Sequence, residues 1–264
     1  MESARRFQTG LTVGLKSFDL LWKHKKLIFY FGAPMLAGVI AKLFIHNFFF
    51  FSPSDTTLFV QGMVSRMWET YGWAKHIGVF LTKLILLLVV TFAAVALTHH
   101  TFAIIKKRKS GIRRSIKACI PKLDRIALWT VILTLVYFLI HHIDMFFLPM
   151  YHNWMAAIVP IFARIVWWIP MLFVIPALAL DEKPLSELIK KSPQITKKMF
   201  YEYLGAIFWI GLIGLLAFIP IWLFLMNKAP FIVVHALVQL IFYVCATVHA
   251  ILKTILYQQY AEPN

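Results

Sequence analysis

Long apolar runs separated by short basic segments occupy most of this 264-residue chain. Six such runs cover residues 27–49, 77–105, 126–149, 154–180, 201–226 and 230–256. An α-helix rises about 1.5 Å per residue, so about 20 apolar residues cross the ~30 Å hydrocarbon layer of a bilayer. Each run is long enough to cross it. The pattern therefore predicts an all-α integral membrane protein with six transmembrane helices.

The composition favours the same class of protein. Hydrophobic residues make up 61% of the chain and charged residues 14%, whereas about 25% of the residues in a soluble domain are charged. A water-soluble chain of this length could not bury so much apolar surface. No segment is long and polar enough to form a separate soluble domain, so we expect residues 1–264 to form a single membrane domain.

Lysine and arginine are concentrated on alternate connections between the runs. The basic connections are residues 1–26, 106–125 and 183–198, and the opposite ones contain only Arg66, Lys75 and Lys228. The positive-inside rule then places both termini in the cytoplasm and makes residues 50–76 an external insertion. The first run lacks a small-residue cleavage site, which predicts a retained span rather than a signal peptide.

The net charge of +16 is mostly a property of this predicted cytoplasmic face. Each basic segment is joined directly to a span, so we expect its partner to be the anionic headgroups of the bilayer rather than nucleic acid. A basic residue near a membrane surface contributes about 1 kcal/mol to this attraction. The candidate lipid contacts follow the second run and are Lys106, Lys107, Arg108, Lys109, Arg113 and Arg114.

The three basic segments also share a helical period. Apolar residues recur every three or four positions, as Phe7, Leu11, Leu15, Phe18 and Trp22, as Ile112, Ile116, Ile120 and Leu123, and as Leu185, Leu188, Ile189, Ile195 and Met199. This period is typical of an amphipathic helix, and a basic polar face suits a helix lying in the membrane interface. Two runs follow each segment. The sequence therefore predicts three repeats of an interfacial amphipathic helix plus a transmembrane hairpin.

Two stretches carry a resemblance to a known group of proteins. Residues 177–192 read Ala-Leu-Ala-Leu-Asp-Glu-Lys-Pro-Leu-Ser-Glu-Leu-Ile-Lys-Lys-Ser, and residues 14–26 read Gly-Leu-Lys-Ser-Phe-Asp-Leu-Leu-Trp-Lys-His-Lys-Lys. With the six-run architecture, they resemble six-span bacterial membrane proteins of unknown function, including the integral-membrane domain fused to some glycerophosphodiester phosphodiesterases. The resemblance implies a bacterial inner-membrane protein that handles lipid or glycerol-phosphate compounds. No phosphodiesterase catalytic domain is attached here, so no catalytic residues carry over.

Ionisable residues within the third and fourth runs are candidates for a functional site, because charges are costly at membrane depth. The third run carries His141, His142 and Asp144 near its outer end, and the fourth carries Arg164. We expect Asp144 and Arg164 to pair across the middle hairpin. Such a pair is either a structural lock that neutralises both charges or part of an anion or headgroup site on Arg164.

The sixth run has a polar face that includes His235, Gln239 and His249. A polar stripe along a span usually faces other helices rather than lipid. It therefore predicts either a packed helix interface or the lining of a water-filled path.

The fourth run contains Pro160, Pro170 and Pro176. Proline inside a span kinks the helix and frees backbone carbonyls. We therefore expect this run to be the most bent one and a candidate for gating or for lining a cavity.

Signals of covalent chemistry are missing from the sequence. We find no paired carboxylates, phosphate-binding glycine loop or nucleophile elbow, and Cys119 and Cys245 are too few for a cluster site. We therefore predict no catalytic residues, cofactor or metal. The leading hypothesis is a protein that binds or moves a small amphiphilic or lipid-related substrate. The alternatives are a membrane scaffold or assembly factor that recruits anionic lipid or protein partners, and a membrane-embedded enzyme acting on lipid headgroups.

Overall fold

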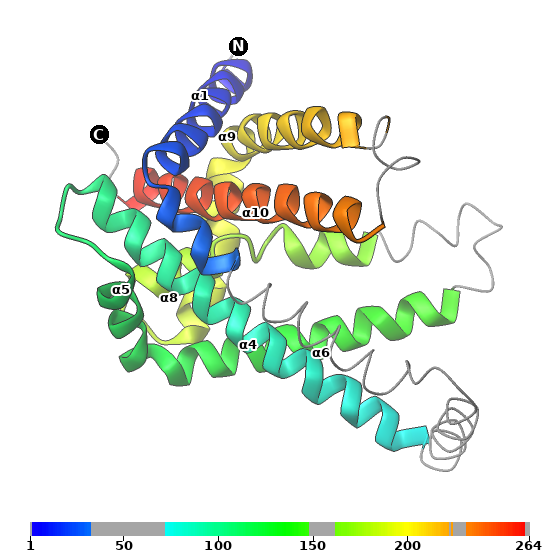
Figure 1. The fold of residues 1–264 in the computed structure, drawn as a ribbon. Coiled ribbons are helices and arrows are strands. Elements are labelled where there is room, and N and C mark those ends of the chain that lie inside the picture. Colours follow the sequence, from blue (N-terminus) through cyan, green and yellow to red (C-terminus); the bar gives the residue numbers. More distant parts are fainter. Residues whose placement is uncertain (1, 33–71, 148–161, 222, 224–230, 262–264) are drawn as a thin grey trace.

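The computed structural model describes residues 2–32, 72–147, 162–221, 223 and 231–261, and no β-strand occurs among them (Figure 1). The helices are α1 (Glu2–Lys23), η1 (Lys25–Ile28), α4 (Gly72–Ile105), α5 (Ile112–Cys119), η2 (Ile120–Lys122), α6 (Leu123–Phe147), α8 (Val174–Leu180), α9 (Leu185–Pro220) and α10 (Phe231–Ala261). Residues 162–168 are also helical. The all-α prediction is confirmed for this part of the chain.

Four helical segments are long and apolar enough to cross a membrane. They are Leu84–Ile105, Ile112–Ile140, Leu185–Pro220 and Leu240–Ala261. They match the second, third, fifth and sixth runs, so by length and composition the chain is a multi-pass membrane protein. Most of the first run, part of the fourth and most of the predicted insertion 50–76 lie outside the described residues, and a total of six spans stays a prediction.

The surface of the long helices is apolar, as expected for contact with lipid tails. Ile85, Leu139, Leu216 and Phe242 are each more than half exposed, and they lie on four different helices. Many further large apolar residues of the long helices are also exposed, among them Leu128, Leu135, Phe208, Leu215 and Leu240. This apolar surface supports the assignment to the membrane class independently of helix length.

Helix α1 packs along α9, and small residues bring the two backbones together (Figure 1). Gly10 and Gly14 are buried on α1, and a Cβ atom added to Gly14 would lie 3.1 Å from the Ala206 carbonyl oxygen. A Cβ atom added to Gly205 would collide with the Phe7 carbonyl oxygen. A glycine four residues after another glycine is the usual device for such close helix packing in membranes.

An ion pair reinforces this contact. Arg6 donates two hydrogen bonds to the Glu202 carboxylate, from Nε to Oε1 (2.7 Å) and from the guanidinium Nη2 to Oε2 (3.0 Å). This forked geometry fixes both side chains better than a single contact would. The hydrogen bond to Glu202 also raises the pKa of the Arg6 guanidinium above its already high ordinary value.

The three amphipathic segments do not fold alike, and this revises the repeat expected from the sequence. The first is the separate helix α1, which leaves Leu15 and Trp22 exposed. The second is the short helix α5, which leads through η2, with Ile120 exposed, directly into α6. The third is the beginning of α9 and continues without a break into the fifth run. Leu188 and Ile195 on its apolar face are fully buried.

The difference has a physical cause. The turn that precedes α9 folds its first part back against α8, and α10 packs against α9 as well. Protein therefore covers the apolar face that was expected to contact lipid. Pro193 lies inside α9 without ending it. Only the first segment is thus a helix separated from the long helices that follow, and the interfacial placement and the threefold repeat stay predictions.

The fourth run is interrupted, as its prolines predict. Residues 162–168 are helical, residues 169–173 form turns, and α8 begins at Val174. Ser192 of α9 bridges the interruption, because its hydroxyl donates to the Pro170 carbonyl (2.7 Å) and accepts from the Phe173 amide (3.1 Å). Ser192 is fully buried. The freed backbone groups are thus satisfied by a side chain of the next helix.

The most buried part of the molecule lies toward the basic segments. Fully buried residues include Leu97 near the end of α4, Leu178 of α8, Leu188 of α9, and Ile251 and Leu252 near the end of α10. The buried core is therefore concentrated where these helix ends meet, and the candidate site lies beside it.

Candidate functional site

The C-terminal end of α4 is fixed by a helix-ending motif. The Arg108 amide donates to the Ala103 carbonyl (2.9 Å), and the Lys107 amide donates to the Ile104 carbonyl (2.9 Å). Lys107 has a φ of 51° and is the one non-glycine residue with positive φ in the described part of the chain. These are the features of a Schellman motif. They set the direction in which the basic segment leaves α4.

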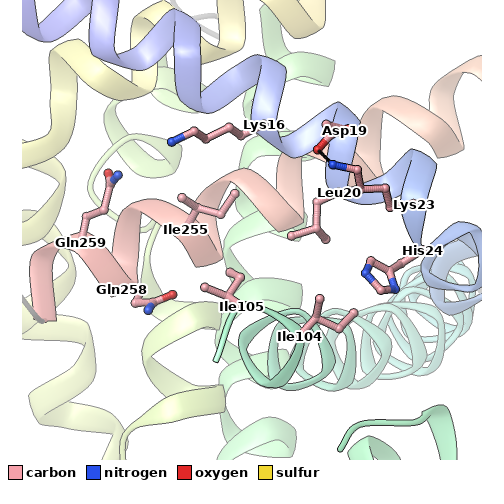
Figure 2. Close-up of a pocket in the computed structure, with 10 residues that line it drawn as sticks. All are labelled: Lys16, Asp19, Leu20, Lys23, His24, Ile104, Ile105, Ile255, Gln258 and Gln259. Atoms are coloured by element: carbon pink, nitrogen blue, oxygen red, sulfur yellow. Dashed lines mark hydrogen bonds and ion pairs between the residues drawn. The ribbon is translucent and has the colours of Figure 1, made fainter. Parts of the chain in front are cut away.

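A pocket of about 570 Å³ opens beside this end, between α1, α4 and α10 (Figure 2). It is lined by Lys16, Asp19, Leu20, Lys23 and His24 from the α1 side, by Ile104 and Ile105 from α4, and by Ile255, Gln258 and Gln259 from α10. We call it the α1–α4–α10 pocket. Its volume is in the range of pockets that bind small molecules.

Helical spacing explains how α1 supplies its wall. Residues 16, 19, 20 and 23 are three or four positions apart, so their side chains share one face of α1. Lys23 donates to Asp19 (2.6 Å), and both are largely exposed. Lys16 extends from α1 toward the side of α10 that carries Gln259 (Figure 2). The polar groups therefore form the rim of the pocket.

Apolar side chains make up the rest of the lining. Leu20, Ile104, Ile105 and Ile255 come from three different helices and converge beside the polar rim (Figure 2). The pocket thus joins a cationic rim to an apolar wall. Such an arrangement suits a ligand with an anionic head and a short apolar tail.

A second pocket, of about 680 Å³, adjoins the first and shares Lys23, His24 and Ile104 with it. Its lining adds Lys25 and Lys26 to the cationic side. His100 also lines it and shares a 2.9 Å hydrogen bond with the buried Tyr30 hydroxyl, which holds the His100 ring in place. The two pockets together surround His24 with lysine side chains.

The predicted basic lipid contacts lie next to these pockets, at the end of α4 and the start of α5. Arg108, Lys109 and Arg114 line a third pocket on the other side of the segment that joins α4 to α5. The first two basic segments of the sequence thus lie around the end of α4, and Arg125 of the second donates to the Lys183 carbonyl at the start of the third (2.9 Å). Their arrangement at one end of the molecule agrees with the expected charge asymmetry, and its cytoplasmic placement stays a prediction.

Arg164 lies on the helical segment 162–168 and faces α6. It lines a small pocket of about 90 Å³ with Tyr137 and Ile140 of α6 and with Trp167. The packing of this segment on α6 is fixed further by Trp129 and Trp167, whose stacked rings are 6.4 Å apart. The third and fourth runs are therefore neighbours.

The predicted Asp144–Arg164 pair is not tested, because the side chains of His141 and Asp144 lie outside the described residues. His142 is described, and its Nδ1 donates to the Phe138 carbonyl one turn earlier (2.8 Å). The pair therefore stays a prediction.

The polar face of the sixth run is described only in part. His249 Nε2 and the Tyr203 hydroxyl of α9 share a 2.9 Å hydrogen bond. His249 therefore lies in the contact between α9 and α10, which agrees with the interpretation of the polar stripe as a packed helix interface. The side chains of His235 and Gln239 lie outside the described residues. Arg164 instead lines the small pocket against α6, so among the described residues the two lie at different helix contacts.

A polar network that the sequence did not indicate holds the turn between α8 and α9. Asp181 Oδ2 accepts hydrogen bonds from Lys191 (2.7 Å) and from the Tyr257 hydroxyl (2.8 Å). Lys122 donates to the carbonyls of Ala179 (2.6 Å) and Leu178 (3.3 Å) at the end of α8. The acidic turn was recognisable in the sequence, but its partners come from α9, α10 and η2, and no spacing rule links them.

Within the described residues, no group of three or more histidine, cysteine, aspartate or glutamate side chains is arranged to hold a metal ion. No family model matches the chain, and no curated protein or solved structure matches it either. The function is therefore inferred from the pockets at the end of α4.

Proposed function

We propose that this multi-pass membrane protein binds or moves a small anionic amphiphile, with the α1–α4–α10 pocket as its binding site. The observation that carries the proposal is that one pocket beside the buried core has lysines, Lys16 and Lys23, on its rim and leucine and isoleucine side chains on its wall. The lysines attract the anionic head, and the isoleucines and Leu20 cover the start of an acyl chain. The ligand enters without covalent chemistry.

The charge balance of the two adjoining pockets supports an anionic ligand. Lys16, Lys23, Lys25 and Lys26 line them, and Asp19 is the one carboxylate among their lining residues. Asp19 is already paired with Lys23. An incoming anion is therefore attracted by the remaining lysines and meets no unpaired carboxylate there.

The resemblance to six-span bacterial proteins points to the same class of ligand. Residues 14–26, which carry part of that resemblance, also form much of the lysine-rich rim. The proposed location is the inner membrane with both termini in the cytoplasm, where anionic lipid heads are available to the pocket.

The test compares two single-chain lipids of equal chain length. Protein purified in neutral detergent is titrated with lysophosphatidylglycerol, which is anionic, or lysophosphatidylcholine, which is zwitterionic, and bound lipid is counted by native mass spectrometry. We expect the anionic lipid to bind more tightly. The double variant Lys16→Gln/Lys23→Gln should lose about 30-fold in affinity, since each basic residue near a headgroup contributes about 1 kcal/mol and the loss of Lys23 leaves the Asp19 carboxylate without its partner.

The matched control is Lys190→Gln/Lys197→Gln, which removes the same charge from exposed positions of α9 outside the pocket. It should bind the anionic lipid like the unchanged protein. Equal loss in both double variants would mean diffuse attraction to a basic surface, and the scaffold alternative would then be favoured. Equal binding of the two lipids would contradict the proposal.

A further inference from the structure

A third pocket lies between the end of α4, α5 and the turn that joins α8 to α9. Its volume is about 530 Å³, and the charged and imidazole side chains that line it are His99, Arg108, Lys109, Arg114, Lys122 and Glu182. We call it the α5 pocket. It shares only Ser110 with the pocket around His24 and shares no lining residue with the α1–α4–α10 pocket.

The α5 pocket is strongly cationic. Four lysine or arginine side chains line it, against the single carboxylate of Glu182. Two of the four are arginines, whose planar guanidinium groups present several N–H donors in a fixed fork. The site therefore offers both positive charge and directional donors.

The walls of the pocket are held in place by contacts within the protein. The helix-ending motif at Lys107 fixes the start of the segment that carries Arg108 and Lys109. Arg114 donates one guanidinium N–H to the Lys109 carbonyl (2.7 Å), which ties α5 to that segment. The backbone that carries Arg108 and Lys109 is thus fixed, and the Arg114 guanidinium is positioned beside it, which lowers the entropic cost of binding a ligand.

The opposite wall is fixed as well. Lys122 donates to the Ala179 carbonyl (2.6 Å), and Asp181 in the same turn is held by Lys191 and Tyr257. The ammonium group of Lys122 is thus anchored at the edge of the pocket, and its charge contributes to the potential inside.

One buried ring nitrogen on the wall lacks a hydrogen-bond partner. His99 lines the α5 pocket, and its Nδ1 is buried without a partner among the described residues. A buried polar atom of this kind is costly unless a ligand or water satisfies it. Side chains from α4, α5 and the segment between them, namely His99, Arg114 and Arg108, thus line one cavity.

We propose that the α5 pocket binds a phosphate group. A phosphate has several acceptor oxygens and suits convergent arginine forks better than a single carboxylate does. The cavity has room for further atoms attached to the phosphate, so the group can be free inorganic phosphate or the phosphate of a lipid headgroup. This site is separate from the amphiphile pocket and does not depend on the function proposed for it.

The experiment uses the full-length protein in neutral detergent, with binding of inorganic phosphate followed by calorimetry at constant ionic strength. Arg108→Gln/Arg114→Gln should weaken binding at least tenfold, because two charge-assisted contacts are lost. Lys190→Gln/Lys197→Gln is the matched control, since it also removes two charges, from exposed positions of α9 that do not line the pocket. It should bind like the unchanged protein.

A second arm separates the two sources of phosphate. Native mass spectrometry counts the phosphatidylglycerol that remains bound from nanodiscs made of phosphatidylglycerol and phosphatidylcholine. Loss of this lipid in the Arg108/Arg114 double variant but not in Lys190→Gln/Lys197→Gln identifies a lipid headgroup. Binding of inorganic phosphate with no retained lipid identifies the free anion. Either result supports the proposal.

Two results would overturn it. One is that neither inorganic phosphate nor the anionic lipid binds, and the other is that Lys190→Gln/Lys197→Gln weakens binding as much as the Arg108/Arg114 double variant. Arg114→Lys guards against misfolding, because it keeps the charge and removes the fork, and it should show an intermediate loss. Lys16→Gln/Lys23→Gln should leave phosphate binding unchanged, so failure of the amphiphile proposal and failure of this one are distinguishable.

Discussion

Ser192 shows how one hydroxyl group supports an interrupted helix. It satisfies the Pro170 carbonyl and the Phe173 amide, two backbone groups left free where the fourth run breaks. Both contacts are made by a residue with no exposed surface. Loss of the hydroxyl would leave these groups buried with neither water nor protein to replace it.

We therefore expect Ser192→Ala to lower the free energy of unfolding by about 1–3 kcal/mol, the usual cost of unsatisfied buried polar groups. The measurement is thermal or denaturant-induced unfolding in detergent. Ser186→Ala is the control, because Ser186 is exposed in the first turn of α9 and should change stability little. Equal stability of the two variants would show that Ser192 does not support the break.

For individual residues, the sequence indicated which ones have a special structural role but not which side chains they contact. Pro170 indicated an interruption, and the fourth run does break there. That Ser192 would bridge the break depends on how α9 folds back, which is a tertiary contact beyond local spacing. The same holds for Tyr203, which pairs with the His249 that the polar stripe had singled out.

At the scale of helices, the contact between α1 and α9 depends on the absence of side chains. Gly205 faces the backbone of α1 at Phe7, whereas a Cβ atom on Gly211 of the same helix would meet nothing within 4 Å. The two glycines therefore separate the effect of close packing from that of helix propensity.

We expect Gly205→Ala to destabilise the protein by about 1–3 kcal/mol through overpacking against α1. Gly211→Ala should be neutral or stabilising by up to about 1 kcal/mol, because alanine favours the helix. Unfolding in detergent gives the stabilities, and limited proteolysis within α1 reports whether it has left α9. A harmless Gly205→Ala would mean that α1 can dock in another way.

The amphipathic period predicted helices in all three basic segments, and helices occur in all three. It did not predict what covers them. Leu15 of α1 is exposed, while Leu188 of α9 is fully buried, although both belong to apolar stripes of the same spacing. An apolar stripe indicates which face of a helix is removed from water, and the tertiary fold decides whether that face packs against lipid or against protein.

At the scale of the whole molecule, hydropathy and length predicted the membrane class and the four spans that are described. They also predicted that the basic segments lie on one side, and the pockets around α4 bring the first two of them together. The pockets themselves were not predictable, because each is lined by residues from parts of the chain that are far apart in sequence. Conversely, the predicted Asp144–Arg164 pair remains untested.

The orientation makes a direct prediction. In a background without Cys119 and Cys245, a cysteine replacing Ser54 should react with a membrane-impermeant thiol reagent in intact cells, because the positive-inside rule puts it outside. A cysteine replacing Ser110 should react only after the membrane is opened. Labelling in the opposite order would reverse the orientation and move the phosphate and amphiphile pockets to the outer face.

The contact between α1 and α9 also has a consequence for the order of events during synthesis. Arg6 and its partner Glu202 are 196 positions apart. At about 5–20 residues per second, α1 emerges roughly 10–40 s before the surface that will cover its glycines. In that interval the bilayer surface can hold α1 through its lysines and its exposed Leu15 and Trp22. The amphipathic face of α1 thus keeps the helix at the membrane until α9 has been synthesised, and the two helices then pack together.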